Sequence, residues 1–126
     1  MKNNGFTWRK RLRSFGYAFH GIFLLVTQEA NAWIHCFAAV CVIVAGFFFD
    51  ISVTEWMAVI FAIGMVLAAE AVNSAVEALA DRVTQEYDEA IKRTKDLASG
   101  AVLILAIAAA IIGCIIFIPK IVLWLS

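Results

Sequence analysis

Charged residues, proline and glycine are all scarce in this chain of 126 residues. Lys, Arg, Asp and Glu make up only 16% of it, against roughly 25% in soluble domains, and the ten basic and ten acidic residues cancel. One proline and seven glycines exclude collagen-like and low-complexity sequence. A net charge of zero leaves no excess of positive charge that would attract a nucleic acid. Because 63% of the residues are hydrophobic, the composition predicts an integral membrane protein.

Glycine-rich phosphate loops and cysteine ligand motifs are absent as well. The glycines stand apart along the chain, so neither the P-loop spacing nor Gly-x-Gly-x-x-Gly occurs. Any bound nucleotide would therefore need charged side chains and a metal ion to hold its phosphates. Cys36, Cys41 and Cys114 lie in apolar runs without a Cys-x-x-Cys pair. We interpret them as small buried apolar side chains rather than as ligands or disulfides.

Three apolar stretches predict membrane-spanning helices. The clearest has no charged residue, and about 23 residues at 1.5 Å each give about 35 Å, enough for a hydrocarbon core near 30 Å. A short polar turn at 50–55 joins the other two, which predicts an antiparallel pair. The fold class is therefore all-α and integral to the membrane, with one domain over 1–126. The predicted spans are 33–49, 56–80 and 97–119.

Residues 9–28 predict a different kind of helix. Apolar side chains from Phe15 to Val26 recur at helical spacing, but charged and polar residues interrupt any continuous span. This pattern is typical of an amphipathic helix that lies in the cytoplasmic headgroup layer. The alternative is a cleaved signal peptide that ends at Ala-Asn-Ala in 30–32. Glu29, directly before that site, fits a signal peptide poorly.

The distribution of basic residues predicts the orientation in the membrane. They precede the first span and recur between the second and third, whereas only Lys120 follows the last span. By the positive-inside rule, the N-terminus and the 81–96 loop are cytoplasmic. Trp33 would then lie at the inner interface, and Trp56 and Trp124 at the outer one. The basic residues used here are Lys2, Arg9, Lys10, Arg11, Arg13, Arg82, Lys92, Arg93 and Lys95.

Four polar side chains share one face of the second predicted span. At 100° per residue, Glu70, Asn73, Glu77 and Asp81 project within about 80° of one another. If Trp56 marks the outer interface, Glu70 lies about 21 Å inward and Glu77 about 31 Å, near the cytoplasmic boundary. A carboxylate inside a bilayer costs about 2.5–3.5 kcal/mol, so two on one face point to function.

Two interpretations of this acidic face stay open. The carboxylates could connect helices, or could pair with Arg82 or Lys95. Four oxygen acceptors in one line favour a site for a cation or a polar headgroup instead. Further carboxylates, a tyrosine and a lysine lie at the same predicted depth, and such groups suit Mg²⁺-assisted phosphoryl transfer. They are Glu29, Glu86, Tyr87, Asp88, Glu89, Lys95 and Asp96.

The segment Glu70-Ala71-Val72-Asn73-Ser74-Ala75-Val76-Glu77, closed by Asp81, resembles a family signature. It is similar to Glu-x-hydrophobic-Asn-Ser/Thr-Ala-hydrophobic-Glu-x-x-x-Asp of the small prokaryotic diacylglycerol kinases, which include the undecaprenol kinases. The similarity covers nearly the whole chain. It extends to Gly16-Tyr17, Gly21, Glu29 and Lys95-Asp96.

The resemblance implies roles for particular residues. Glu70 would be the catalytic base, Asn73 would position Glu70 or the substrate, and Glu29 and Glu77 would hold Mg²⁺. Lys10 stands where other members have arginine, so a compact ammonium group replaces a planar guanidinium that can donate several hydrogen bonds at once. Ala18 replaces a serine found in some members. The positions that match nucleotide contacts are Lys10, Tyr17, Glu86, Tyr87, Asp88, Lys95 and Asp96.

The resemblance also implies an activity and an assembly. We expect an ATP- and Mg²⁺-dependent kinase of a lipid alcohol, as a homotrimer with shared sites in the bacterial inner membrane. The stretches Trp33–Val40 and Ser99–Val102 are closer to the undecaprenol branch, and Glu86-Tyr87 is closer to the diacylglycerol branch. A small proton- or cation-coupled transporter and a non-enzymatic assembly subunit are the alternatives. A transporter would need Glu70 but would not use Glu29, Glu77 and Lys95 together.

Overall fold

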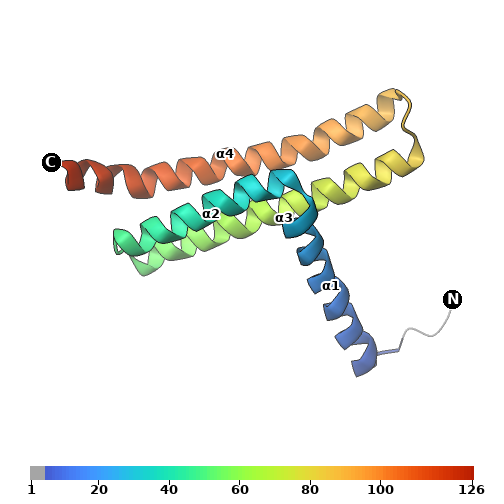
Figure 1. Cartoon of the computed structure of the whole chain (residues 1–126), viewed down its shortest axis with the longest axis horizontal. Helices are drawn as coiled ribbons and strands as arrows, with labels where there is room; N and C mark the ends of the chain where they lie inside the picture. The colour runs from blue at the N-terminus through green and yellow to red at the C-terminus, as the bar shows by residue number, and fades with distance from the viewer. Residues whose placement is uncertain (1–4) are drawn as a thin grey trace.

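The computed structural model describes residues 5–126 as a bundle of α-helices with one helix that projects from it. The second and third helices along the chain form an antiparallel hairpin, the fourth and longest helix runs alongside them, and the N-terminal helix leads away from the bundle (Figure 1). Lys2, used above to predict orientation, lies outside the described residues. The helices are α1 (Trp8–Gln28), α2 (Ala30–Phe48), α3 (Val53–Val83) and α4 (Glu89–Leu125).

Polar caps make α3 and α4 longer than the spans predicted from hydrophobicity. Ser52 and Glu55 form a capping box at the start of α3, with hydrogen bonds of 3.0 and 3.2 Å. Asp88 accepts a 3.0 Å hydrogen bond from the backbone N–H of Ile91 and so caps α4. α4 also continues beyond Pro119, where the predicted span ended. The predicted ends followed the uninterrupted apolar runs, whereas the helices continue through polar turns at 53–55, 81–83 and 89–96 and past Pro119 to Leu125.

The break between α1 and α2 falls at Glu29. Its backbone is extended, with φ −107° and ψ 109°, and so ends one helix and begins the next. The Trp33 indole Nε1–H donates a 2.8 Å hydrogen bond to the Val26 carbonyl, which ties the first turn of α2 to the last turn of α1. The observed α1 therefore agrees closely with the helix predicted over 9–28, while its position at a membrane surface stays a prediction.

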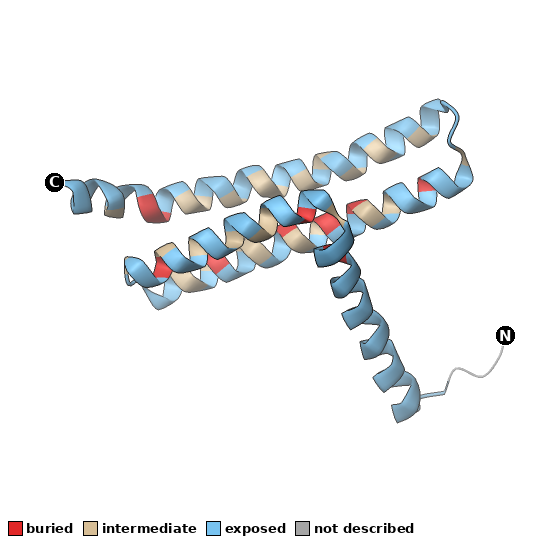
Figure 2. Ribbon diagram, viewed as in Figure 1, coloured by how far each residue is buried: buried red, intermediate tan, exposed pale blue. Residues whose placement is uncertain are grey.

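Most residues of the chain are exposed, as the predominance of pale blue in Figure 2 shows, and many of them are large apolar side chains. α2, α3 and α4 are each long and apolar enough to cross a membrane. A small core closes the end of the bundle that holds the α2–α3 turn. Its buried members are Ile51, Val59, Ile116 and Phe117.

Aromatic side chains gather at this same end of the bundle. The ring centroids of Phe47 and Trp56 are 4.9 Å apart, and those of Phe48 and Trp124 are 5.6 Å apart. Trp56 and Trp124, predicted to share one interface, thus lie at one end of the protomer. Lys120 closes this end with a 2.9 Å ion pair to the carboxylate at the start of α3.

The cysteines are all free thiols, but they are less buried than we predicted. Cys36 is half-buried, whereas Cys41 and Cys114 are exposed. The prediction of burial is wrong for these last two within the protomer. The reason is that a helix in a membrane can turn apolar side chains outward, so an apolar run does not by itself imply packing inside the protein.

Candidate functional site

The Glu70 carboxylate is buried against a histidine of the neighbouring helix. Glu70, on α3, is 2% exposed, and its Oε2 lies 3.4 Å from Nε2 of His35 on α2. Among residues 5–126, His35 is the only side chain that the structure places in ion-pair or hydrogen-bonding range of this carboxylate. A buried carboxylate without a polar partner is strongly unfavourable, and His35 is the polar partner that the structure gives to Glu70.

The sequence interpretation gave His35 no role in the site. The register of the antiparallel α2–α3 hairpin could have indicated that His35 lies near Glu70. His35 lies about 20 Å along α2 from the turn, and Glu70 about 25 Å along α3 from the same turn. The two residues are therefore about one helical turn apart in height, and their long side chains can meet across the antiparallel pair.

Asn73 lies one turn from Glu70 and is buried too, at 6% exposure. Its side-chain oxygen has no hydrogen-bond partner within the described part of the chain. An unsatisfied buried acceptor costs about 1–3 kcal/mol, which a bound molecule with a hydroxyl or amide donor can recover. A polar acceptor of this kind beside a buried carboxylate suits recognition of an alcohol.

Glu77 and Glu29 differ from this buried pair. Glu77 is exposed and Glu29 half-buried, and neither carboxylate has an ion pair or hydrogen bond among the residues the structure describes. The face predicted to carry four polar groups thus divides into a buried part and an open part. The division follows from the start of α2 at Ala30, beyond which α2 no longer covers α3.

The chemistry of these two open carboxylates fits Mg²⁺. Within residues 5–126 no group of three or more His, Cys, Asp or Glu side chains is arranged to hold a metal ion. Mg²⁺ commonly takes one or two carboxylates and completes its coordination with water and substrate phosphates. Glu29 and Glu77 each have the chemistry to bind an ion that arrives with a nucleotide.

Lys95 and Asp81 connect α4 to α3. Lys95 Nζ lies 2.5 Å from Asp81 Oδ1. The open interpretation in which Lys95 pairs with Glu70 or Glu77 is therefore wrong within the protomer. Since the Lys95 side chain is 36% exposed and that of Asp81 53% exposed, the pair remains accessible to a soluble ligand.

The α3–α4 loop brings together four of the residues predicted to contact nucleotide. A hollow of about 340 Å³ is lined by the loop and the first turns of α4. We call it the loop hollow. Its charged and aromatic lining combines carboxylates with lysines, as a metal-bound polyphosphate requires. The predicted residues that line it are Glu86, Tyr87, Asp88 and Lys95.

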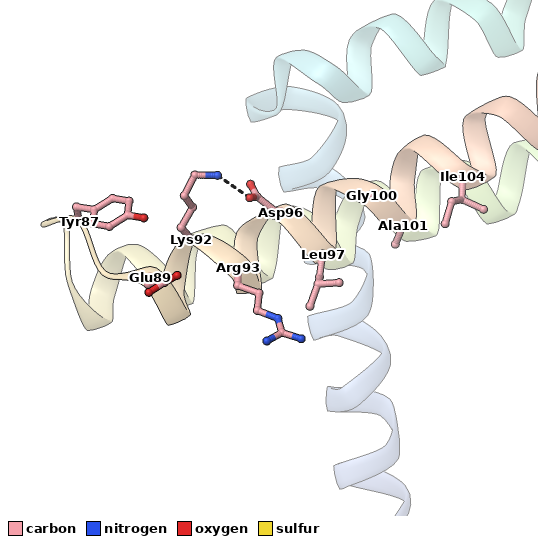
Figure 3. Close-up of a pocket in the computed structure, with 9 residues that line it drawn as sticks. All are labelled: Tyr87, Glu89, Lys92, Arg93, Asp96, Leu97, Gly100, Ala101 and Ile104. Carbon is pink, nitrogen blue, oxygen red and sulfur yellow. Dashed lines mark hydrogen bonds and ion pairs between the residues drawn. The ribbon is translucent and has the colours of Figure 1, made fainter.

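A second hollow, of about 550 Å³, lies on the outer face of the first turns of α4 (Figure 3). Asp96 reaches toward Lys92 there, with Nζ 2.6 Å from the carboxylate oxygen. Since 37 residues make α4 about 55 Å long, it is longer than a hydrocarbon core near 30 Å, and these first turns precede the span predicted at 97–119. The hydrogen bond to Asp96 raises the pKa of Lys92, which therefore keeps its positive charge. Tyr87 lines both hollows.

Two predicted nucleotide contacts lie elsewhere in the protomer. Lys10 and Tyr17 are exposed on α1, the helix that projects away from the bundle (Figure 1). The structure does not bring them to the loop hollow or to Glu70 within one chain. The site is thus assembled in part on α2, α3 and the α3–α4 loop.

Comparison with known proteins decides the family. Residues 16–117 match the model of the prokaryotic diacylglycerol kinases. The chain belongs to this family. It is 37% identical over 108 residues to an undecaprenol kinase of Bacillus subtilis, covering 86% of this chain and 88% of that protein. It is 32% identical over 116 residues to a diacylglycerol kinase of Escherichia coli, covering 92% of this chain and 95% of that protein.

Membership of this kinase family confirms two of the expectations drawn from the sequence. The resemblance carried by the Glu70–Asp81 signature is confirmed, and so is the enzyme class, a membrane lipid kinase. The interpretations as a transporter or a non-enzymatic assembly subunit lose their support. The roles of individual site residues stay predictions.

Proposed function

We propose that the protein transfers the γ-phosphate of ATP to the hydroxyl group of a membrane lipid alcohol, with Mg²⁺ as cofactor. The observation that carries this proposal is the buried carboxylate of Glu70 beside the unpaired side-chain oxygen of Asn73, in a member of a lipid kinase family. ATP is soluble and the lipid is not. The two must therefore meet where the apolar part of α3 gives way to the polar α3–α4 loop.

Glu70 would act as the general base. The hydroxyl oxygen of the lipid forms a bond to the γ-phosphorus, its proton passes to the Glu70 carboxylate, and the bond from phosphorus to the leaving oxygen of ADP breaks. Asn73 would accept a hydrogen bond from the substrate and hold it beside Glu70. Because Glu70 lies on the apolar part of α3, deeper than Glu77, it can meet a lipid hydroxyl below the bilayer surface, where a base in solution cannot reach.

The open carboxylates and the loop would hold the nucleotide. Glu29 and Glu77 would coordinate Mg²⁺, which when bound neutralises charge on the transferring phosphoryl group. Lys95 lies at the loop hollow, where its ammonium can contact phosphate oxygens as a point charge. Asp81 holds that ammonium in place until a nucleotide binds. The further contacts proposed for the nucleotide are Glu86, Tyr87, Asp88 and Asp96.

Placement in the membrane and assembly complete the proposal. We place the N-terminus, α1 and the α3–α4 loop on the cytoplasmic side of the bacterial inner membrane, with α1 in the headgroup layer, in accord with the basic residues near the loop and on α1. Since Lys10 and Tyr17 lie apart from the loop hollow within one chain, a homotrimer with sites shared between protomers would supply them from a neighbour. The large exposed apolar surface of α2, α3 and α4 is compatible with such an assembly.

The preferred lipid is the finer part of the proposal. The relatives include one named for undecaprenol and one named for diacylglycerol, and both lipids present a primary alcohol. We propose undecaprenol, in accord with the stretches Trp33–Val40 and Ser99–Val102. The test uses purified protein in detergent with Mg-ATP and each lipid in turn, scored for undecaprenyl phosphate and phosphatidic acid. A higher kcat/KM for diacylglycerol would overturn the choice of undecaprenol, and no product from either lipid would overturn the proposed activity.

A further inference from the structure

His35 is a polar residue in surroundings that otherwise offer it nothing to bind. It lines an apolar hollow of about 240 Å³ between α2, α3 and α4, which we call the alanine hollow. Every other residue that lines it is Ala, Val, Ile, Leu or Gly. A polar ring in such a place is unfavourable unless it has a hydrogen-bonding partner. The contact with Glu70 is the one that the structure gives it among the described residues.

The contact involves one defined atom on each side. Nε2 of His35 lies 3.4 Å from Oε2 of Glu70, and the structure places no protein partner against Oε1 within residues 5–126. A neutral imidazole with its proton on Nε2 and a charged imidazolium both donate from this atom. In either state, Nε2 of His35 faces one carboxylate oxygen at 3.4 Å, and no described side chain donates a hydrogen bond to the other oxygen.

Holding the carboxylate in this way matters for catalysis by a general base. A carboxylate that can rotate and shift reaches the substrate hydroxyl in only part of its conformations, and misplacement by about 1 Å can cost about 100-fold in rate. Asn73 lies on the same helix, but its side-chain oxygen cannot donate to a carboxylate, and its amide N–H groups make no hydrogen bond to Glu70 among the described residues. Orientation of Glu70 therefore falls to a side chain from α2.

We infer that His35 is a positioning residue that orients the Glu70 carboxylate for proton transfer from the lipid hydroxyl. This inference rests on the proposed function, because it assigns His35 a part in the same proton transfer. His35 does not itself exchange a proton with the substrate in this scheme. Its effect should therefore appear in the rate of phosphoryl transfer and not in the binding of ATP.

The test compares three variants of the full-length protein in detergent micelles. His35→Leu removes the donor, His35→Asn shortens it out of reach of Glu70, and His35→Gln keeps an N–H near the position of Nε2. Cys36→Ala, at the next and half-buried position of α2, is the control for general effects on helix packing. For each variant, kcat and the KM for ATP are measured with a saturating lipid alcohol, and circular dichroism gives the helical content.

We expect kcat to fall by about 100-fold in His35→Leu and His35→Asn, while the KM for ATP stays within twofold. His35→Gln should recover at least about tenfold of that loss, and Cys36→Ala should match the wild type. A kcat within twofold of wild type in His35→Asn would overturn the inference. Equal losses in the Asn and Gln variants with unchanged helical content would overturn it too.

The wild-type measurement separates this inference from the proposed function. If the wild-type protein phosphorylates no lipid alcohol, the proposed function fails before the His35 variants are compared. If the wild type is active and His35→Asn is equally active, the activity stands and the role of His35 falls.

Discussion

Replacement of Glu70 by glutamine is the perturbation whose effect follows most directly from the structure. The amide has nearly the shape of the carboxylate but cannot accept a proton at neutral pH. Glu70 is 2% exposed, and the next carboxylate along α3, Glu77, lies about 10 Å further along the helix axis. No other α3 carboxylate can therefore take over the proton, and water has little access.

The expected size of the effect comes from the contribution of a general base. Such a group supplies about 10²–10⁴-fold in rate, which corresponds to about 3–5 kcal/mol in the activation barrier. We expect kcat of Glu70→Gln to fall by that factor while the affinity for ATP stays unchanged, because the loop hollow is built from other residues. The assay follows transfer of label from [γ-³²P]ATP to a lipid alcohol and measures ATP binding separately.

Glu77→Gln is the matched control, since it changes an exposed carboxylate on the same helix. We expect this variant to need more Mg²⁺ for half-maximal rate and to recover much of its kcat when Mg²⁺ is saturating. A Glu70→Gln protein that retains more than a tenth of wild-type kcat would refute the assignment of Glu70 as the base. Identical Mg²⁺ dependence in Glu77→Gln and wild type would remove Glu77 from the metal site.

Three further predictions concern packing, the nucleotide and the pair between Lys95 and Asp81. A Cβ at Gly46 would lie 2.6 Å from Cη2 of Trp56, whereas one at Gly64 meets nothing within 4 Å. Gly46→Ala should therefore lower the free energy of unfolding in micelles by about 1–3 kcal/mol relative to Gly64→Ala. Equal values for the two variants would contradict the packing of the α2–α3 hairpin. Lys95→Met should raise the KM for ATP about tenfold or more, and an unchanged KM would contradict the contact of Lys95 with phosphate. Asp81→Asn should change the free energy of unfolding by less than about 1 kcal/mol, because the ion pair between Asp81 and Lys95 is exposed.

The helical architecture could be predicted because it depends on local signals. The three apolar runs correspond to α2, α3 and α4, and the interrupted pattern of 9–28 corresponds to α1. The turn predicted at 50–55 is shorter than expected, because α3 begins at Val53. The helix ends were less predictable. Capping by Ser52 and Asp88 extends α3 and α4 through polar turns that a bilayer-based prediction leaves out.

The site shows a similar division between local and long-range information. The helical period places Glu70 and Glu77 on one side of α3, but it carries no information on which helix covers each of them. The coverage of each carboxylate depends on where α2 begins, and the start of α2 leaves Glu70 buried and Glu77 exposed. The partner of Glu70 comes from 35 residues earlier in the chain, so its identification needs the register of the hairpin as well as the sequence of α3.

Phosphate transfer to lipid by the purified protein tests the central claim most directly. The protein is incubated in micelles with [γ-³²P]ATP, Mg²⁺ and a total lipid extract, and the organic phase is then counted and separated by chromatography. We predict labelled lipid phosphate that requires Mg²⁺ and falls at least about 100-fold in Glu70→Gln. Label that stays entirely in the aqueous phase, whichever lipid alcohol is added, would contradict the claim.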